Sequence, residues 1–181
     1  MIAPLAKLSE CIAKREYARD AKALERPVSR RLSSVSRRLL EEAQSQARTL
    51  NDNHVGTEHI VLAIYALGTR AATKALESFG VTRELFAAQL HEEPGSSPRG
   101  KIPLTPRARM IVALVGAEAK RMGSEPVEPE HILLGVIRES QRWKANGISG
   151  PHHLSAAAKA AGTTLAAIEQ KLIHGMGSDY D

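Results

Sequence analysis

The sequence has few of the residues that stabilise disulfide-rich, aromatic-rich or membrane-spanning proteins. Its single cysteine, Cys11, cannot form an internal disulfide, which is typical of a reducing cytosol. Aromatic residues make up 3% of the 181 residues and hydrophobic residues 43%, so the core must consist of Ala, Leu, Ile and Val, which favours helices. No apolar run approaches the ~18 residues of a membrane span. We therefore expect a cytoplasmic, helical protein without membrane contact.

Acidic residues are absent from the stretch "RPVSRRLSSVSRR", although the whole chain carries a net charge of only +5. Such a stretch can contact nucleic acid, but more often it is a solvated linker and helix start. A basic nucleic-acid-associated or regulatory protein that uses residues 26–38 is therefore the alternative function. The arginines are Arg26, Arg30, Arg31, Arg37 and Arg38.

The stretch "GSSPRGK", which begins at Gly95, closely resembles the start of a nucleotide-binding loop. A phosphate-binding loop would need a hydroxyl at the next position, where Ile102 stands, and a buried strand before its first glycine. No strand pattern precedes it, and Pro103 follows directly. We interpret the segment from about His91 to Pro103 as a hinge rich in Pro, Gly and Ser, and not as part of an NTPase.

An internal repeat is the strongest signal in the chain. The segment that begins at Leu32 matches the segment that begins at Leu104 without a gap, at an offset of 72 residues. Apolar positions stay in phase throughout, and "EHIVLA" in the first copy matches "EHILLG" in the second. Further on the offset grows to 82, so about ten residues are inserted around "SQRWKANGISGPHH". Two related units therefore form the protein.

Each copy has the pattern of a helical unit. Apolar residues at positions 39, 40, 43, 47 and 50 follow the stripe of an amphipathic helix. Thr105 followed by Pro106 is a strong helix start, and Ser33 occupies the same position in the first copy. Gly80 and Gly162 are candidate C-terminal caps of later helices. The sequence predicts an all-α fold of two tandem four-helix units.

These motifs resemble the double Clp repeat, the N-terminal domain of Clp/Hsp100 unfoldases and especially of the ClpC type. The likeness rests on "GTEHI" and "PEHILLG", on "KALESFGV" and on the inter-repeat phrase "IPLTPRAR". It covers about residues 31–175. It implies two repeats related by a pseudo-two-fold axis, over residues 31–91 and 104–175, with a linker over 92–103 and a tail over 176–181. No ATPase module of such an unfoldase follows in this sequence, so we expect a stand-alone domain.

The resemblance also implies a function. Clp N-domains of this kind dock substrates and adaptors without catalysis or a cofactor, and those of the ClpC branch are similar to receptors for phosphoarginine-marked proteins. Each repeat offers one site, in which an acid takes the guanidinium and a helix-capping hydroxyl helps to hold the phosphate. By motif, the acids are Glu58 and Glu130, the hydroxyls are Ser33 and Thr105, and Arg31 is a further candidate for the phosphate. The expected partners are the Clp unfoldase and protease machinery, its substrates and its adaptors, and the protein would act as an adaptor or a decoy.

Structural roles compete with these assignments. Any acid in the first turn of a helix gains stability from the helix dipole, so Glu58 and Glu130 are either ligand contacts or caps. His59 and His131 follow the acids, and we interpret them as structural histidines and not as metal ligands. The second copy reads "EPEH", so Glu128 replaces the glycine of "GTEH"; we therefore expect the first site to be the better one.

Two segments depart from the repeat pattern. The insertion carries Trp143, and we expect it to reshape the surface near the second unit. Residues 1–30 have Leu5, Leu8, Ile12 and Tyr17 close to helical spacing, which predicts an amphipathic helix that packs on the domain or on a partner.

Overall fold

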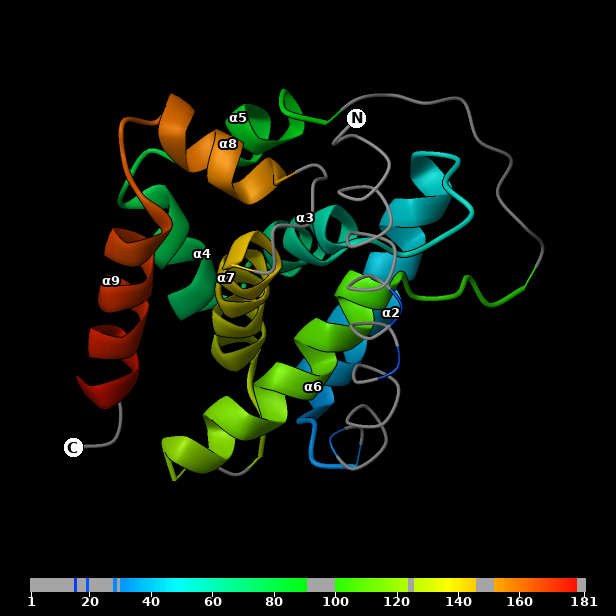
Figure 1. Cartoon of the computed structure of the whole chain (residues 1–181), viewed down its shortest axis with the longest axis horizontal. Helices are drawn as coiled ribbons and strands as arrows, with labels where there is room; N and C mark the ends of the chain where they lie inside the picture. The colour runs from blue at the N-terminus through cyan, green and yellow to red at the C-terminus, as the bar shows by residue number, and fades with distance from the viewer. Residues whose placement is uncertain are drawn as a thin grey trace, which may run out of the picture.

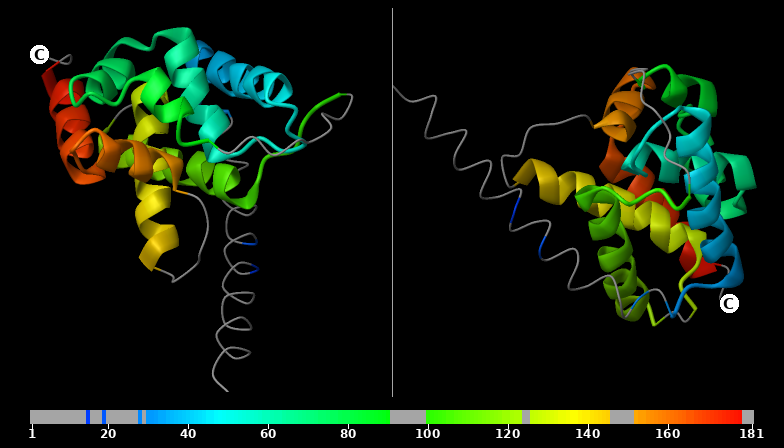
Figure 2. Two further views of the ribbon diagram at one scale, coloured as in Figure 1. Left: turned by 90° about the horizontal axis from the view of Figure 1, so that it is seen from above. Right: turned by 90° about the vertical axis from the view of Figure 1, so that its right-hand side faces the viewer.

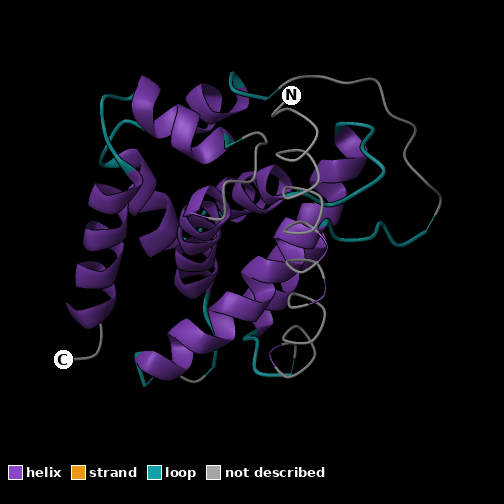
Figure 3. Cartoon of the chain, in the orientation of Figure 1, coloured by secondary structure: helices purple, strands orange, loops and turns teal. Residues whose placement is uncertain are grey.

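A computed structural model of the chain describes residues 30–90, 100–123, 126–145 and 152–178, together with residues 15, 19 and 28. From Ser34 onward these residues form eight α-helices and no β-strand, which confirms the all-α prediction (Figure 3). The helices are α2 (Ser34–Thr49), α3 (Thr57–Leu67), α4 (Arg70–Glu77), α5 (Arg83–Ala87), α6 (Pro106–Arg121), α7 (Pro129–Ala145), α8 (His153–Ala160) and α9 (Leu165–Ser178). None of the helices in this described part is both long and apolar enough to span a membrane.

The first helix of each repeat begins at its predicted cap. The Ser33 hydroxyl accepts a hydrogen bond from the Ser36 amide, and the Thr105 hydroxyl accepts one from the Ala108 amide, each over 3.1 Å. Pro106 occupies the first turn of α6, where its missing N–H costs nothing. Each hydroxyl therefore satisfies a helix-terminal amide that would otherwise lack a partner.

The four helices of one repeat correspond to the four of the other. α2 packs on α3 as α6 packs on α7, whereas α4 contacts α9 and α5 contacts α8 across the two repeats (Figure 1). In the left view of Figure 2, α2 lies on the upper side and α6, α7 and α8 on the lower side. The repeats differ in length at two places: α7 is six residues longer than α3 because the insertion extends it, and α9 is longer than α5.

Two short backbone bridges join the repeats reciprocally. Leu32 pairs with Val127, and Val55 pairs with Leu104. The offset of 72 converts the first pair into the second with the partners exchanged, as a two-fold axis requires. The Ser33 amide donates to the Val127 carbonyl over 3.0 Å, and the Thr105 amide donates to the Val55 carbonyl over 2.9 Å. The pseudo-two-fold symmetry therefore extends to individual hydrogen bonds.

The core is aliphatic, as the composition predicts. Leu39, Ala43 and Ala47 of the predicted stripe are fully buried, and Leu40 and Leu50 pack against the core at its edge. Phe86 is the only aromatic side chain in the main core cluster of the described residues. Each fully buried Leu or Ile side chain contributes about 1.5–3 kcal/mol to folding, so an aromatic-poor core of this size is sufficient.

α6 and α7 approach each other closely at Gly135. A Cβ at this position would lie 2.6 Å from Cγ2 of Val115 and 3.2 Å from the Ile111 carbonyl oxygen. Ala63 holds the equivalent position in α3, so the second helix pair has the closer contact. Small size at Gly135 is thus a packing requirement.

The predicted glycine caps adopt the expected conformation. Gly80 follows α4 and Gly162 follows α8, and both have φ of 72°, in the left-handed region that glycine enters without strain. The Gly80 amide donates to the Glu77 carbonyl and the Gly162 amide to the Lys159 carbonyl. These turns reverse the chain into the last helix of each repeat.

Several predicted features lie outside the described residues: Cys11, most of the N-terminal helix, the hinge from 91 to 99 and part of the insertion. The end of the loop that resembles a nucleotide-binding motif is described. There the Arg48 guanidinium donates to the Gly100 carbonyl over 2.6 Å. Ile102 is buried, and its amide donates to the Gln44 side chain over 3.3 Å. This segment packs on α2, consistent with a linker.

Candidate functional site

The bridges bring each predicted hydroxyl next to the acid of the other repeat. Thr105 is bonded to Val55, which precedes Glu58 by three residues, and Ser33 is bonded to Val127, which precedes Glu130 by three residues. The expectation of one site in each repeat stays a prediction. The bridges indicate that the acid and the capping hydroxyl of such a site come from different repeats.

The Glu58 carboxylate is folded back over the start of its own helix. Its Oε2 accepts a hydrogen bond from the Thr57 hydroxyl over 3.2 Å, and its side chain is 24% exposed. A Cβ on Gly56 would overlap this carboxylate, so the glycine of "GTEH" is what allows the carboxylate to lie there. Because Glu128 stands in the place of Gly56 in the second repeat, Glu130 cannot adopt the same arrangement.

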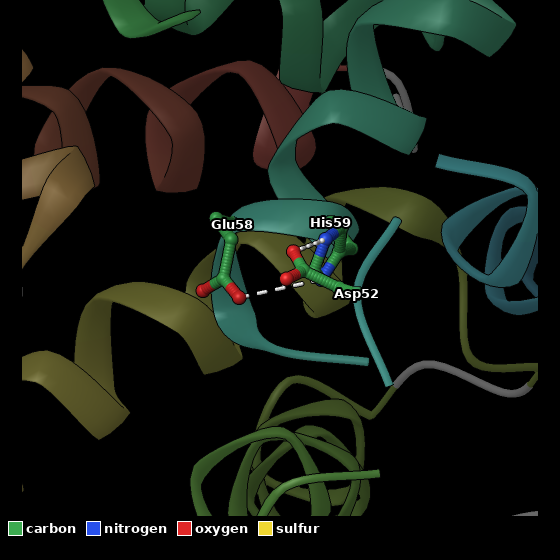
Figure 4. Close-up of side chains that lie close together, drawn as sticks. All are labelled: Asp52, Glu58 and His59. Carbon is green, nitrogen blue, oxygen red and sulfur yellow. Dashed lines mark ion pairs between the residues drawn. The ribbon is translucent and has the colours of Figure 1, made fainter. Parts of the chain in front are cut away.

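His59 anchors the turn that holds Glu58 (Figure 4). Its Nδ1 accepts the Gly56 amide over 2.9 Å, and its Nε2 lies 2.9 Å from Oδ2 of Asp52. The first bond assigns the proton to Nε2, which faces the Asp52 carboxylate. In the second repeat the His131 Nδ1 accepts the Glu128 amide over 3.0 Å in the same way. Both histidines therefore serve as structural caps, as the sequence favours.

One group in the described part of the chain has the spacing of metal ligands. Atoms of Asp52, Glu58 and His59 lie within 4.8 Å of one another. A metal ion needs a lone pair on the imidazole, but Nδ1 accepts the Gly56 amide, and in this tautomer Nε2 carries the proton and faces Asp52. The bond to the Gly56 amide gives His59 a structural role in the turn before α3.

Glu130 lies near the start of α4, which belongs to the other repeat. Burial raises the pKa of Glu130 above its ordinary value, and the nearby Glu128 adds to this, while the backbone amides of Ala71 and Ala72 at the start of α4 lower it. Thr69, the residue that precedes α4, makes no capping bond with its own side chain. The Glu130 carboxylate is thus placed at the N-terminus of a neighbouring helix, where a negative charge is favoured.

The two hydroxyls also differ in accessibility. Ser33 is 9% exposed, whereas Thr105 is half-buried at the start of α6. Arg31, the further phosphate candidate, is half-buried, and its carbonyl accepts the Val127 amide over 2.9 Å. Of the two crossed pairs, Glu58 with Thr105 is the accessible one. The pair of Ser33 and Glu130 is largely enclosed.

A small cavity, open to solvent, lies beside Glu58. We call it the Glu58 cavity. Residues of both repeats line it, among them Thr57, Arg107, Glu139, Ser140 and His152. The N-terminus of α8 also faces it, and His152 makes no side-chain cap there. Three helix starts therefore meet around one cavity.

Arg107 and Glu139 form the charged wall of this cavity. The Arg107 Nε and Nη2 donate to the two Glu139 carboxylate oxygens over 2.7 and 2.8 Å, and Glu139 is fully buried. The Arg107 guanidinium also lies over the Trp143 ring, 4.9 Å from its centroid. Sequence reasoning missed this pair. Its one signal was the insertion, because Trp143 lies in the extended part of α7 and Glu139 directly precedes that part.

Comparison with known families identifies this architecture. The profile of the Clp repeat (R) N-terminal domain matches residues 7–79 and residues 31–148. The chain belongs to the Clp repeat N-terminal domain family. The first match begins well before Arg31, where the resemblance noted from the motifs begins.

The relatives of this Clp N-domain are chaperones and protease subunits. It is 38% identical over 117 residues to the chaperone protein ClpB of Oceanobacillus iheyensis, covering 61% of this chain and 14% of that protein. It is 33% identical over 141 residues to the chloroplastic chaperone protein ClpC of Pisum sativum, covering 75% of this chain and 15% of that protein. The ATP-binding subunit ClpC of the ATP-dependent Clp protease from Staphylococcus saprophyticus is 35% identical over 113 residues, covering 61% and 14%. The chain thus spans about one seventh of the length of these relatives.

Solved structures show the same fold. The N-terminal domain of Hsp104 from Candida albicans superposes with a TM-score of 0.65 at 15% identity, covering 82% of this chain and 93% of that one. The N-terminal domain of the chaperone ClpD from Arabidopsis thaliana superposes with a TM-score of 0.59 at 15% identity, covering 81% and 98%. At this level of identity the likeness concerns the fold alone.

Proposed function

We propose that this Clp N-domain is a non-catalytic binding module of the Clp chaperone and protease system, and that it recognises protein segments carrying phosphoarginine. The observation that supports this most is the position of Glu58. Its carboxylate is partly exposed beside the cavity, while its counterpart Glu130 lies near the start of α4. A partly exposed carboxylate beside a helix start suits a ligand that carries both a guanidinium and a phosphate.

The ligand would bridge α3 and α6. Its guanidinium would donate to the Glu58 carboxylate, the geometry in which Arg-like groups bind carboxylates most strongly. Its phosphate would lie at the N-terminus of α6, where the helix dipole favours an anion. The Thr105 hydroxyl accepts the Ala108 amide and keeps its own hydrogen to donate to the phosphate. Binding without a reaction would serve an adaptor, or a decoy that withholds marked proteins.

The proposal assigns one working site to the domain. A ligand at the second pair would have to draw Glu130 away from the start of α4 and would reach a Ser33 hydroxyl that is 9% exposed. Both changes cost free energy before any contact is made, because a buried polar group left without its partner costs about 1–3 kcal/mol. We therefore expect a stoichiometry of one.

Calorimetric titration with free phosphoarginine tests the function. Arginine and phosphoserine serve as control ligands, because each has only half of the proposed recognition group. Glu58→Gln should abolish selective binding, whereas Glu130→Gln should leave it in place. Absence of binding at millimolar phosphoarginine by a folded protein would overturn the phosphoarginine assignment. Equal loss in both variants would overturn the single-site assignment.

Nucleic acid remains the second candidate, because Arg30, Arg37 and Arg38 are exposed at the start of α2. Such binding would weaken steeply with salt, since each phosphate contact releases counterions. A DNA titration at two salt concentrations, with Arg37→Ser/Arg38→Ser as the matched variant, distinguishes it from ligand binding at Glu58.

A further inference from the structure

Glu58 and Glu130 hold the same position in the two repeats, but their carboxylates lie in different places. The Glu58 carboxylate is folded back over the start of α3, where its Oε2 accepts a hydrogen bond from the Thr57 hydroxyl over 3.2 Å. The Glu130 carboxylate instead lies near the start of α4, where the amides of Ala71 and Ala72 act on it. One acid of the repeat therefore has two arrangements within this chain.

The helix start that corresponds to the start of α4 is close to Glu58. An offset of 82 residues relates α4 to α8, and it places the first two residues of α8 at the positions of Ala71 and Ala72. α3, which carries Glu58, contacts α8, just as α7, which carries Glu130, contacts α4 (Figure 1). Glu58 and the first two residues of α8 also line the same cavity. The start of α8 therefore has the same relation to Glu58 as the start of α4 has to Glu130.

The start of α8 can accept a carboxylate. The first amides of a helix have no partner within the helix, and their partial positive charge favours an anion. His152, which precedes α8, makes no cap with its side chain. The His153 side chain is directed elsewhere, since its Nδ1 lies 2.9 Å from the Gln89 carbonyl oxygen. A carboxylate placed here would stabilise α8 as a helix cap does.

Two residues of the first repeat favour the folded-back position of Glu58. Gly56 leaves room for the carboxylate, because an added Cβ would overlap it. Thr57 provides the hydroxyl that donates to it. The second repeat has neither feature, since Glu128 replaces the glycine and Pro129, which has no donor, replaces the threonine. Both differences coincide with the change in the position of the acid.

We propose that Gly56 and Thr57 are positioning residues that keep Glu58 in its ligand-binding position, and that without them the Glu58 carboxylate moves to the start of α8 and closes the cavity. The closed arrangement would repeat that of Glu130 at α4. The inference rests on the proposed function, because it concerns the carboxylate that would bind the guanidinium. A ligand that needs the open arrangement binds more weakly in proportion to the fraction of molecules that are closed.

Nuclear magnetic resonance tests the movement without any ligand. In Gly56→Ala, the amide resonances of His153 and Leu154 should shift to lower field, because they gain a charged acceptor. Adding Glu58→Gln to this variant should reverse the shift. Glu128→Ala changes the equivalent position of the second repeat and should leave both resonances in place. Unshifted amides in Gly56→Ala would overturn the proposal.

A double-mutant cycle followed by thermal unfolding is the second test. Glu58→Gln should lower the unfolding midpoint more in the Gly56→Ala background than in the native chain, because only there does the carboxylate stabilise α8. Thr57→Val, which removes the hydroxyl, should act as a second such background. Glu130→Gln is the matched control, and its effect should be the same in every background. Equal effects of Glu58→Gln in all of them would contradict the movement.

Calorimetric titration with phosphoarginine separates this inference from the proposed function. The affinity of Gly56→Ala should be about tenfold lower than that of the native chain. Amide shifts in Gly56→Ala without phosphoarginine binding by the native chain would support the movement of Glu58 and overturn the proposed function. Phosphoarginine binding by the native chain, without amide shifts in Gly56→Ala, would overturn the movement alone.

Discussion

Arg107 and Glu139 form a bidentate ion pair between the first turn of α6 and the third turn of α7, with the Glu139 side chain fully buried. The equivalent positions in the first repeat hold Val35, which is 43% exposed, and Leu67, which is half-buried. The buried ion pair is therefore a feature of the second repeat.

Breaking this pair should destabilise the domain strongly. Arg107→Val leaves the Glu139 carboxylate buried without its partner, and Glu139→Leu does the same to Arg107, so each should cost about 3–5 kcal/mol. The double variant copies the first repeat and should cost less than either single variant. Urea unfolding of all four proteins measures this. Additive losses in the double variant would show that the two residues act independently.

Gly56→Ala should weaken ligand binding with little effect on stability. The backbone at Gly56 has φ of −94°, which alanine adopts easily, but the new Cβ would displace the Glu58 carboxylate. We expect phosphoarginine affinity to fall about tenfold, or about 1.4 kcal/mol, by calorimetry. Glu128→Ala alters the equivalent position of the second repeat and should leave the affinity unchanged. Equal affinities in Gly56→Ala and the native protein would show that the carboxylate position is immaterial.

His131 should make stability depend on pH. Burial lowers its pKa below the ordinary value of 6.5, so the unfolded chain binds its proton more readily than the folded one. Its contribution is fully present above about pH 6.5 and is lost as the pH falls towards the lower folded pKa. His131→Gln keeps an acceptor for the Glu128 amide but does not titrate. Unfolding free energies between pH 7.5 and 5 should fall less steeply in this variant; parallel curves would contradict the assignment.

Gly135→Ala should destabilise the contact between α6 and α7. The added Cβ meets Val115 and the Ile111 carbonyl, and overpacking of this kind costs about 1–3 kcal/mol. The gain in helix propensity recovers at most about 1 kcal/mol. Gly175→Ala is the matched control, because no neighbouring atom lies within 4 Å of an added Cβ there. Thermal unfolding should show a lower midpoint for the first variant only, and a raised midpoint for both would refute the packing argument.

Local features of the fold could be predicted from the sequence because they depend on neighbouring residues. The caps at Ser33 and Thr105, the stripe of α2 and the turns at Gly80 and Gly162 all follow from spacing and from residue type. The repeat offset also predicted the correspondence of the helices. Each of these involves contacts within a few residues along the chain.

The site was less predictable because its partners are distant in sequence. The Thr105 amide binds the Val55 carbonyl in the turn before Glu58, and this bond depends on how the two repeats pack. A repeat found in the sequence does not specify that packing. No sequence motif indicates that Glu130 lies near α4, since the Ala71 and Ala72 amides could be those of any helix start. The change from Gly56 to Glu128 was the one visible sign that the two acids would differ.

The reciprocal bridges between Leu32 and Val127 and between Val55 and Leu104 have a consequence for the unit of folding. One repeat produced alone would contain one side of each bridge without the residue that pairs with it. The simplest way to pair these backbone groups is to bind a second copy of the same repeat. The domain thus resembles a dimer of two similar subunits joined by a linker, in which the equivalent acids Glu58 and Glu130 have different surroundings.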